Sequence, residues 1–500
     1  MNQSLKQQLH RMFDFTFAAL FLVTFVGVYY WYRRPKNFPP GPRGIPFLGV
    51  IPLFGKWPER QCNEWKKKYG PVFSMRVLGR EEWIVLNDFE SINQCLVKQS
   101  NKFSGRPFFE ALQTLIHGKG LSFLDYGPLW KSQRKFGQKI IRGIGLERKG
   151  VDSCVNDEVP FLLESLRATD GKAFDILGIL PKSSCNVLCS VFMGKRYEYD
   201  DDTLCTLVRL FSDVFHSSFD NFSLQLFIFA PKLMYIYPFS QSYKKLKKLF
   251  EDYAEILNRV IAEHEETFDK EHPRDFIDAF LKNMKEGSDK NFHIEQLHMY
   301  IRDIFEGGIE TTTNTLNWSL ICLLHYPEIQ TKLREEIREI VGQSGSVKMS
   351  HKDDMPYTNA FIEENLRFLT SAPLGFQHKT NQDAEINGYI IPKGTTVTPN
   401  IWAVQNDPKY FDEPEKFKPE RFIDEKGNFI KSEHVIPFSV GARRCMGEHL
   451  ARMEVFIFLV SMIQRFEILP DPESKIPVLN DGINGPTFVP YSYKLIFQEI

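Results

Sequence analysis

The sequence predicts a mainly helical protein of the α+β class, in which a large helical part joins a smaller, β-rich N-terminal region. The longest helical pattern runs from Glu295 to Tyr326 and ends at Pro327, because proline cannot continue a helix. A second run of apolar residues at helical spacing follows Cys445, and two short strand-like runs lie between Val72 and Leu86, around a glycine. An uncharged apolar stretch precedes all of these and predicts one transmembrane helix.

The N-terminal stretch from Phe15 to Tyr32 has no charged residue and, at about 18 residues, is just long enough to cross a bilayer. Basic residues crowd the side that follows it, at Arg33, Arg34, Lys36 and Arg43. The positive-inside rule then leaves the chain after this stretch on the cytoplasmic side. A cleaved signal peptide is the alternative, but no small-x-small cleavage site follows, and the basic residues lie on the wrong side for it.

The rest of the chain is organised as one unit. The sequence has 500 residues, 43% of them hydrophobic, and no low-complexity linker, repeat or long charge block follows its N-terminus. A stiff, non-helical hinge with the sequence Phe38-Pro-Pro-Gly-Pro42 comes after the apolar stretch. We therefore expect an anchor over residues 1–32, a basic, proline-rich hinge over 33–48 and one large domain over 49–500.

Charge and cysteine content argue against two other classes of protein. The formal net charge is −1, without the basic excess that nucleic-acid binding requires. The eight cysteines should mostly be free thiols on the reducing, cytoplasmic side of a membrane. Cys185 and Cys189, and likewise Cys445 and His449, have ligand-like spacing, but neither pair has the second pair that a structural zinc site needs.

The segment from Phe438 to Glu448 surrounds Cys445 with residues that suit a metal thiolate. Gly441 and Gly447 let the backbone bend and approach a flat ligand, and Arg443 places a positive charge two residues before the sulfur. Because a helix should start just after this segment, its N–H groups are expected to stabilise an anionic sulfur and lower its pKa. The alternative is a small buried cysteine, the commoner fate of an isolated one.

The long predicted helix is weakened at its centre. Gly307 and Gly308 each cost about 1 kcal/mol relative to alanine inside a helix. The threonines that follow, from Thr311 to Thr313, offer hydroxyl groups that compete for backbone carbonyls and can bend the helix. Packing gives no reason to weaken such a helix, so we expect a groove for a ligand there.

Four motifs together resemble those of the cytochrome P-450 family, and they occur in that family's order. Phe438-x-x-Gly-x-Arg-x-Cys-x-Gly447 is similar, without a mismatch, to its haem-binding signature, and Gly307-Gly-Ile-Glu-Thr-Thr312 to its oxygen-activation motif. Glu364-x-x-Arg367 and Pro419-Glu-Arg-Phe422 resemble the two parts of its Glu–Arg–Arg network. The resemblance covers essentially the whole chain and is closest to the animal microsomal branch, often called family two.

The resemblance implies the cytochrome P-450 fold and haem b as cofactor, with Cys445 as the thiolate ligand of the iron. The residues it implies for binding the haem propionates are Arg106, Trp130, Arg134, His378 and Arg443. The acid–alcohol pair of oxygen activation would be Glu310 and Thr311, and the structural network Glu364, Arg367 and Arg421. Arginine suits such a site, because buried carboxylates must be paired and its fork binds them at two points.

The resemblance also implies a substrate pocket. Its expected lining is Phe108, Leu112, Leu115, Phe305, Glu306, Gly307, Ile309, Leu374 and Phe488. Glu306 is unusual, because related enzymes commonly have an apolar or small residue there. Facing the pocket it would favour basic amines or hydroxyl donors, whereas the alternative is a salt bridge to Arg302. The aromatic stretch from Phe211 to Tyr237 would form the roof, with a tip that either enters the membrane or is ordinary core.

A member of this family would be a haem-thiolate monooxygenase that inserts one atom of O2 into small lipophilic substrates of xenobiotic, steroid or fatty-acid type. Electrons would come from NADPH through NADPH–cytochrome P-450 reductase at the endoplasmic reticulum membrane, with cytochrome b5 as a further candidate donor. A basic docking face is expected at Lys131, Lys135, Lys139 and Arg142, with a merely solvated helix face as the alternative.

Two other functions stay open at this point. One is a haem-thiolate isomerase or dehydratase that needs no outside electrons, against which the presence of Thr311 counts. The other is a non-enzymatic haem-based sensor, for which the chain has no appended output domain. Dependence on a reductase distinguishes the monooxygenase from both.

Overall fold

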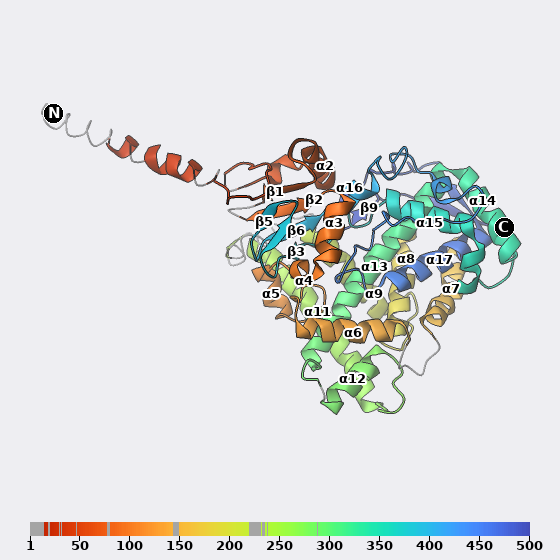
Figure 1. The fold of residues 1–500 in the computed structure, drawn as a ribbon. Coiled ribbons are helices and arrows are strands. Elements are labelled where there is room, and N and C mark those ends of the chain that lie inside the picture. The colour runs from red at the N-terminus through yellow and green to blue at the C-terminus, as the bar shows by residue number, and fades with distance from the viewer. Residues whose placement is uncertain are drawn as a thin grey trace, which may run out of the picture.

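Helices form most of the protein (Figure 1). The computed structural model describes residues 15–18, 21–29, 31, 33–46, 48–77, 81–143, 150–219, 232, 236–237, 239–287 and 289–500. The α-helices are α2 (Pro58–Tyr69), α3 (Phe89–Asn93), α4 (Ser100–Phe103), α5 (Glu110–Ile116), α6 (Pro128–Ile141), α7 (Val151–Arg167), α8 (Leu180–Phe192), α9 (Asp202–Phe219), α11 (Phe239–Glu266), α12 (Phe276–Glu286), α13 (Ile294–His325), α14 (Pro327–Ile340), α15 (Pro356–Phe368), α16 (Ile401–Gln405) and α17 (Glu448–Arg465). Shorter helical segments are η1 (Ile51–Leu53), η2 (Gln94–Lys98), η3 (Ile176–Gly178), η5 (Met349–Asp354) and η6 (Pro419–Phe422).

The strands form one sheet in the order β1-β2-β6-β3 and three smaller pairs. They are β1 (Val72–Arg76), β2 (Glu82–Leu86), β3 (His378–Lys379), β4 (Ala384–Ile386), β5 (Tyr389–Ile391), β6 (Thr396–Pro399), β7 (Phe466–Pro470), β8 (Ile483–Asn484), β9 (Phe488–Val489) and β10 (Leu495–Glu499). The two predicted short strands are confirmed as β1 and β2, and the structure shows that they pair antiparallel. The β-rich region is not purely N-terminal, because β2 also pairs in parallel with β6 from the second half of the chain. Such a long-range pairing leaves no local pattern in the sequence.

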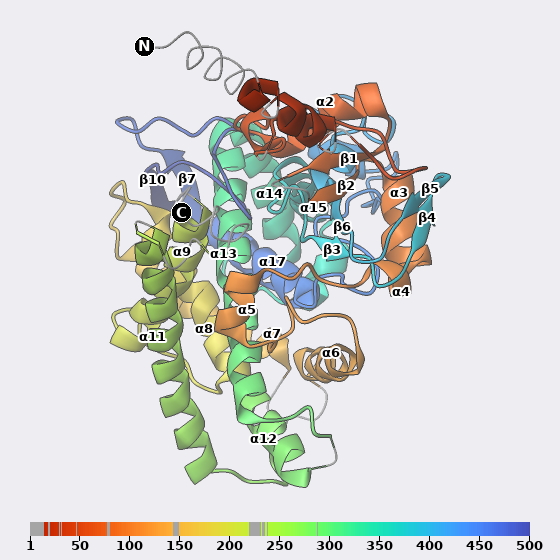
Figure 2. The ribbon, with the colours of Figure 1, turned by 90° about the vertical axis from the view of Figure 1, so that its left-hand side faces the viewer.

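Helix α13 passes through the middle of the protein (Figure 2). It spans 32 residues and begins one residue before the predicted start, and the His293 side chain caps it by accepting from the N–H of Gln296. It packs against α8, α9, α15 and α17, and its second half is almost entirely buried. Pro327 opens α14 immediately afterwards, so the predicted helix and its end are confirmed.

The N-terminal segment leads away from the body as a helix (Figure 1). Its apolar side chains lie in the open, with Phe15 and Phe17 each 79% exposed and Val23 72%. Within the described residues, no helix combines the length and the apolar character that crossing a membrane demands. Of the aromatic stretch expected to roof a pocket, α9 reaches Phe219, and most of the remainder, including its expected membrane-facing tip, falls outside the described residues.

Candidate active site

The cysteine loop, which we define as residues 438–447, is a tight turn just before α17. The N–H of Cys445 donates to the carbonyl of Phe438 at 2.9 Å. Gly441 has φ +79°, and a Cβ there would lie 1.7 Å from the carbonyl oxygen of Leu96, so only glycine fits. All eight cysteines lie in the described residues, and Cys445 alone among them is exposed. The predicted junction of loop and helix is confirmed.

The pKa of Cys445 is raised, whereas the helix start was expected to lower it. Protein atoms packed around one side of the sulfur are the largest cause, since they displace water and disfavour the thiolate, although the residue remains exposed on its other side. The N–H groups of Gly447 and Glu448 and the charge of Arg134 act in the expected direction but do not outweigh burial. A sulfur in this setting stays deprotonated when a metal ion supplies further positive charge.

Three arginines, Arg106, Arg134 and Arg443, converge beside the cysteine loop, and we call them the arginine cluster. The guanidinium groups of Arg443 and Arg134 lie 4.2 and 5.4 Å from the centre of the Trp130 ring. Trp130 and Arg134 share one helix, α6, as their spacing predicted, and Arg134 donates to the carbonyl of Arg444 inside the loop. The structure therefore brings the arginines and the tryptophan into one group.

The short loop 120–124 orients two of these arginines with its backbone carbonyls. Arg443 donates to Leu124 at 2.7 Å and to Leu121 at 3.3 Å, and Arg106 donates to Ser122 at 2.9 Å. None of the three cluster arginines forms an ion pair with a carboxylate of the described residues. The guanidinium groups are fixed by neutral partners, and no carboxylate of the described residues pairs with them directly.

This uncompensated charge shows in the pKa values of the arginine cluster. Burial and then the charge of Arg134 lower the pKa of Arg106 to about 10, and burial and then the charge of Arg106 lower that of Arg443 to about 8. Asp125 opposes both effects only in part, and it is itself paired with Lys379 at 2.7 Å. Because buried cations are costly without anions, the cluster fits a ligand that carries two carboxylates, as haem does.

His378, on β3, adds a ring to the same group. Its Nδ1 donates to the carbonyl of Phe103 at 2.8 Å. Burial, followed by the charges of Arg106 and Arg443, holds the pKa of His378 well below its usual value. Since Nδ1 carries the hydrogen of this bond, Nε2 of the neutral ring can only accept. The ring becomes a donor on that side when an anion such as a carboxylate favours its protonation.

The two central glycines of α13 lie in different surroundings. A Cβ on Gly308 would lie 2.8 Å from a leucine side chain of α8, whereas a Cβ on Gly307 would meet nothing within 4 Å. One turn later, Thr311 Oγ1 donates to the carbonyl of Gly307 at 2.7 Å. Glu310 is buried and accepts from Asn314 at 3.1 Å. Gly308 thus serves packing, while Gly307 and Thr311 border open space in an otherwise buried helix.

Glu364, on α15, joins two arginines. Arg367 donates to both of its oxygens, at 2.6 and 2.7 Å, and Arg421 donates to one of them at 3.1 Å. A further Arg367 nitrogen donates to the carbonyls of Gln405 and Pro414. The three residues expected to form a network thus lie in a single set of hydrogen bonds, and Glu364 and Arg367 are fully buried.

The residues expected to line a substrate pocket lie in several environments. Phe108 is 70% exposed, and Phe305 packs against Phe211 with ring centres 5.9 Å apart. Phe488 stacks on Trp318 at 4.9 Å. Of the other expected lining residues, the buried ones are Leu115 and Ile309, and the half-buried ones are Leu112, Leu374 and Glu306. Glu306 forms the ion pair with Arg302 that the sequence offered as its alternative.

Sequence reasoning missed the side chains that hold loop 120–124 in place. Asp303 Oδ2 accepts the N–H groups of Leu121 and Ser122 at 2.6 and 2.8 Å. Gln296 both donates to and accepts from the backbone of Gly120. One signal was present in the sequence: Asp303 lies four residues before the first central glycine and hence on the same face of α13.

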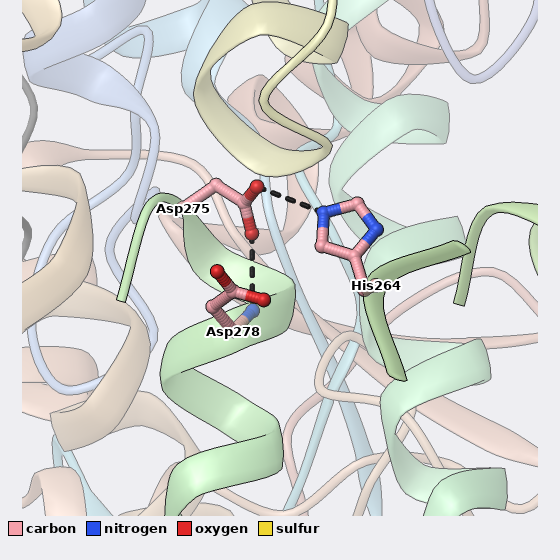
Figure 3. Close-up of side chains that lie close together, drawn as sticks. All are labelled: His264, Asp275 and Asp278. Atoms are coloured by element: carbon pink, nitrogen blue, oxygen red, sulfur yellow. Dashed lines mark hydrogen bonds and ion pairs between the residues drawn. The ribbon is translucent and has the colours of Figure 1, made fainter. Parts of the chain in front are cut away.

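A second cluster, between α11 and α12, brings three possible metal ligands within 4.8 Å of one another (Figure 3). His264 donates from Nε2 to Asp275 at 2.9 Å and from Nδ1 to the carbonyl of Val260 at 2.7 Å. Asp278 accepts three bonds from Arg274, two from its side chain and one from its backbone N–H, and the N–H of Asp278 donates to Asp275. Both ring nitrogens face acceptors, so the ring is protonated and offers no lone pair to a metal. We call these four charged residues the histidine clamp.

An accessible cysteine beside arginines without carboxylate partners is the arrangement expected of a haem-thiolate protein. A family model described as "Cytochrome P450" matches residues 39–497, and the chain belongs to this family. Similar proteins include "Cytochrome P450 2C3" of Oryctolagus cuniculus, 36% identical over 93% of this chain and 94% of that protein. "Cytochrome P450 2U1" of Bos taurus is 33% identical over 97% and 94%, and "Cytochrome P450 2F2" of Mus musculus 35% over 90% and 92%.

Family membership confirms the enzyme class and the cofactor. The protein is a cytochrome P-450 monooxygenase, and its cofactor is haem held through a cysteine thiolate. The relatives named above all carry family-two names, as the strings flanking the motifs indicated.

Proposed function

We propose that the protein oxidises small lipophilic substrates of xenobiotic, steroid or fatty-acid type, with electrons from NADPH delivered by NADPH–cytochrome P-450 reductase. The observation that carries the site is the arginine cluster, whose buried charges lack a carboxylate and lie beside an accessible cysteine. A dicarboxylate cofactor supplies the missing negative charge.

In this proposal Cys445 is the iron ligand, and the arginine cluster, Trp130 and His378 bind the haem propionates. Haem supplies the oxygen-activating redox chemistry when it is bound. The chain contributes a prepared site: backbone carbonyls already orient Arg106 and Arg443, so little side-chain freedom is lost on binding. Gly307 leaves room for a flat ligand against α13.

In the proposal, Thr311 delivers a proton at the site and Glu310 replaces it. The hydroxyl hydrogen of Thr311 rests on the carbonyl of Gly307, and rotation about the Cβ–Oγ1 bond presents it to the open side of the helix instead. The neighbouring carboxyl of Glu310 is the group that can replace that proton. Glu364, Arg367 and Arg421 have a structural role, because their hydrogen bonds join α15 to the segment before η6.

Electron partners are proposed to dock on α6. The basic residues Lys131, Lys135 and Lys139 of this helix, and Arg142 directly after it, are all exposed, while the opposite face of the helix buries Trp130. An acidic surface on the reductase, or on cytochrome b5 as a second donor, complements this charge.

Membrane attachment is proposed through the N-terminal segment. Residues 1–32 act as a single-pass anchor in the endoplasmic reticulum membrane, 33–48 as the hinge and 49–500 as the catalytic domain on the cytoplasmic side. The exposed phenylalanines and valines of the described N-terminal helix support this, because such a surface is costly in water.

Reconstitution tests the proposed function. The protein, NADPH–cytochrome P-450 reductase and NADPH are combined with a panel of lipophilic compounds, and NADPH use, O2 use and product are measured together. The proposal expects all three to depend on substrate and reductase. Turnover of an organic peroxide without NADPH would instead identify an isomerase, and haem binding without any turnover would identify a sensor.

Replacing Thr311 tests its assigned role. Thr311→Ala should keep haem and substrate binding but divert electrons into hydrogen peroxide, so that the ratio of product to NADPH falls about tenfold or more. The matched control is Thr315→Ala, one turn further along α13, which should leave that ratio close to the wild-type value. Unchanged coupling in Thr311→Ala would refute the role.

A further inference from the structure

Three charged side chains of α13, Arg302, Asp303 and Glu306, form what we call the charged triad. The Nη1 atom of Arg302 lies 3.4 Å from Asp303 Oδ1, and its Nη2 pairs with Glu306 Oε2. The guanidinium also stacks over the ring of Phe250, with 4.2 Å to the ring centre. One cation therefore serves two carboxylates inside a largely apolar region.

With both carboxylates ionised, the charged triad carries one negative charge more than positive charge. Burial makes this surplus costly, and it raises the pKa of Glu306 and of Asp303 against the opposing charge of Arg302. Asp303 commits its second oxygen to the N–H groups of Leu121 and Ser122. Glu306 pairs with Arg302 and has no other hydrogen bond or ion pair within the described part of the chain. The surplus charge thus falls on the carboxylate with the fewest partners.

Glu306 is also the triad member that solvent or a ligand can reach. Its side chain is 20% exposed, compared with 4% for Arg302 and 7% for Asp303. It directly precedes Gly307, which borders the open space beside Thr311, and consecutive helical residues are about 100° apart around the axis. The neighbouring residue on its other side, Phe305, is fully buried. The surplus charge therefore lies at the edge of that open space.

We propose that Glu306 determines substrate specificity by binding a protonated amine of the substrate. An ammonium group placed there balances the triad and makes a charge-assisted hydrogen bond, while Arg302 keeps its bond to Asp303. A substrate carboxylate would add to the negative surplus and is disfavoured, and a neutral substrate is neither helped nor hindered. This inference rests on the proposed function, because it selects among lipophilic substrates of the same site.

Binding to the ferric haem protein tests the inference. The probes are a hindered tertiary amine, whose nitrogen cannot reach the iron, and matched neutral and carboxylate compounds of the same shape, followed by the Soret shift and by calorimetry. Wild type should bind the amine about tenfold more tightly than the neutral probe. Equal affinities for the two probes in the wild type would overturn the proposal without any variant.

Variants sharpen this test. Glu306→Gln should weaken amine binding about tenfold and leave the neutral probe within about twofold, whereas Glu306→Asp should retain the preference. The control is Glu295→Gln, which removes an exposed carboxylate at the start of the same helix and should change neither affinity. Equal losses for both probes in Glu306→Gln would also overturn the proposal. Its failure is distinguishable from that of the proposed function, because neutral substrates would still be turned over with NADPH and reductase.

Discussion

The arginine cluster and the histidine clamp both contain buried charges, but they differ in charge balance. In the clamp, two positive groups pair with two negative ones, and every ring nitrogen and carboxylate already has a partner. Figure 3 shows three of the four residues, with the His264 ring and the N–H of Asp278 both bonded to Asp275. In the cluster, three positive groups rest on backbone carbonyls and meet no carboxylate of the described residues. Residue type alone would have ranked them the other way, since histidine with two aspartates looks like a metal site.

The difference teaches that charge balance separates a structural cluster from a ligand site. A paired buried charge is stable as it stands, whereas an unpaired one costs free energy until a ligand arrives. The histidine clamp holds α11 and α12 together through its hydrogen bonds, whereas the arginine cluster lacks an anion, which a ligand can supply. The experiments below can break this distinction or make it quantitative.

The largest effect is expected at the sulfur beside the arginine cluster. Cys445→Ala should abolish the strongly red-shifted Soret band of the reduced carbon-monoxide complex, and with it all turnover, because the other cysteines are buried or half-buried. Cys205→Ala, at a half-buried cysteine, should retain the band in full. Survival of the band in Cys445→Ala would show that Cys445 is not the iron ligand.

Removal of one cluster arginine should weaken haem binding more than it weakens the fold. Arg443→Leu is expected to lower haem affinity roughly ten- to a hundredfold, because charged hydrogen bonds contribute about 1.5–3 kcal/mol. The measurement is haem transfer to an excess of a haem-free globin, with urea unfolding of the haem-free protein alongside. An unchanged transfer rate together with a large loss of stability would make the cluster structural, like the clamp.

The histidine clamp should show the reverse pattern. His264→Ala is expected to lower the free energy of unfolding by about 1–3 kcal/mol, because Asp275 loses its buried partner, and to leave haem affinity unchanged. His272→Ala, at an exposed histidine paired with Asp269, should change stability by less than about 0.5 kcal/mol. If zinc raised the melting temperature of the wild type, or a chelator lowered it, the clamp would be a metal site after all.

The smallest expected effect is the pH dependence of the clamp. Burial alone would lower the pKa of His264, but the hydrogen bond and charge of Asp275 outweigh it and raise that pKa. A raised folded-state pKa contributes stability that is fully present below the ordinary pKa and is lost as pH rises through the folded value. Urea unfolding should therefore show the gap between wild type and His264→Gln shrinking from about pH 6 upward. A gap that grows with pH would contradict a protonated ring.

Local patterns in the sequence predicted the helices and strands whose formation depends on residues close together in the chain. The long helix α13 and the two strands β1 and β2 were found from periodicity, and the junction before α17 from the run of apolar residues after Cys445. The parallel pairing of β2 with β6 could not be predicted in this way, because it depends on two segments far apart in the chain.

Residue identity alone could not predict the electrostatics of the site. The pKa of Cys445 follows from the protein atoms that displace water around its sulfur, and this effect outweighs the helix start that the sequence revealed. The role of Asp303 depends on a loop that only the fold brings against α13. The sequence left Glu306 open between facing a pocket and pairing with Arg302, and the structure shows the pair with Arg302, with the carboxylate still 20% exposed.

The peptide unit between Leu121 and Ser122 lies between two opposite charges. Its N–H, on Ser122, donates to the carboxylate of Asp303, and its carbonyl, on Leu121, accepts from Arg443. A peptide dipole of about 3.5 D has its positive end at the N–H, so both charges polarise this unit in the same sense. Asp303 on α13 and Arg443, two residues before Cys445, therefore stabilise each other without direct contact, because both polarise the amide between them.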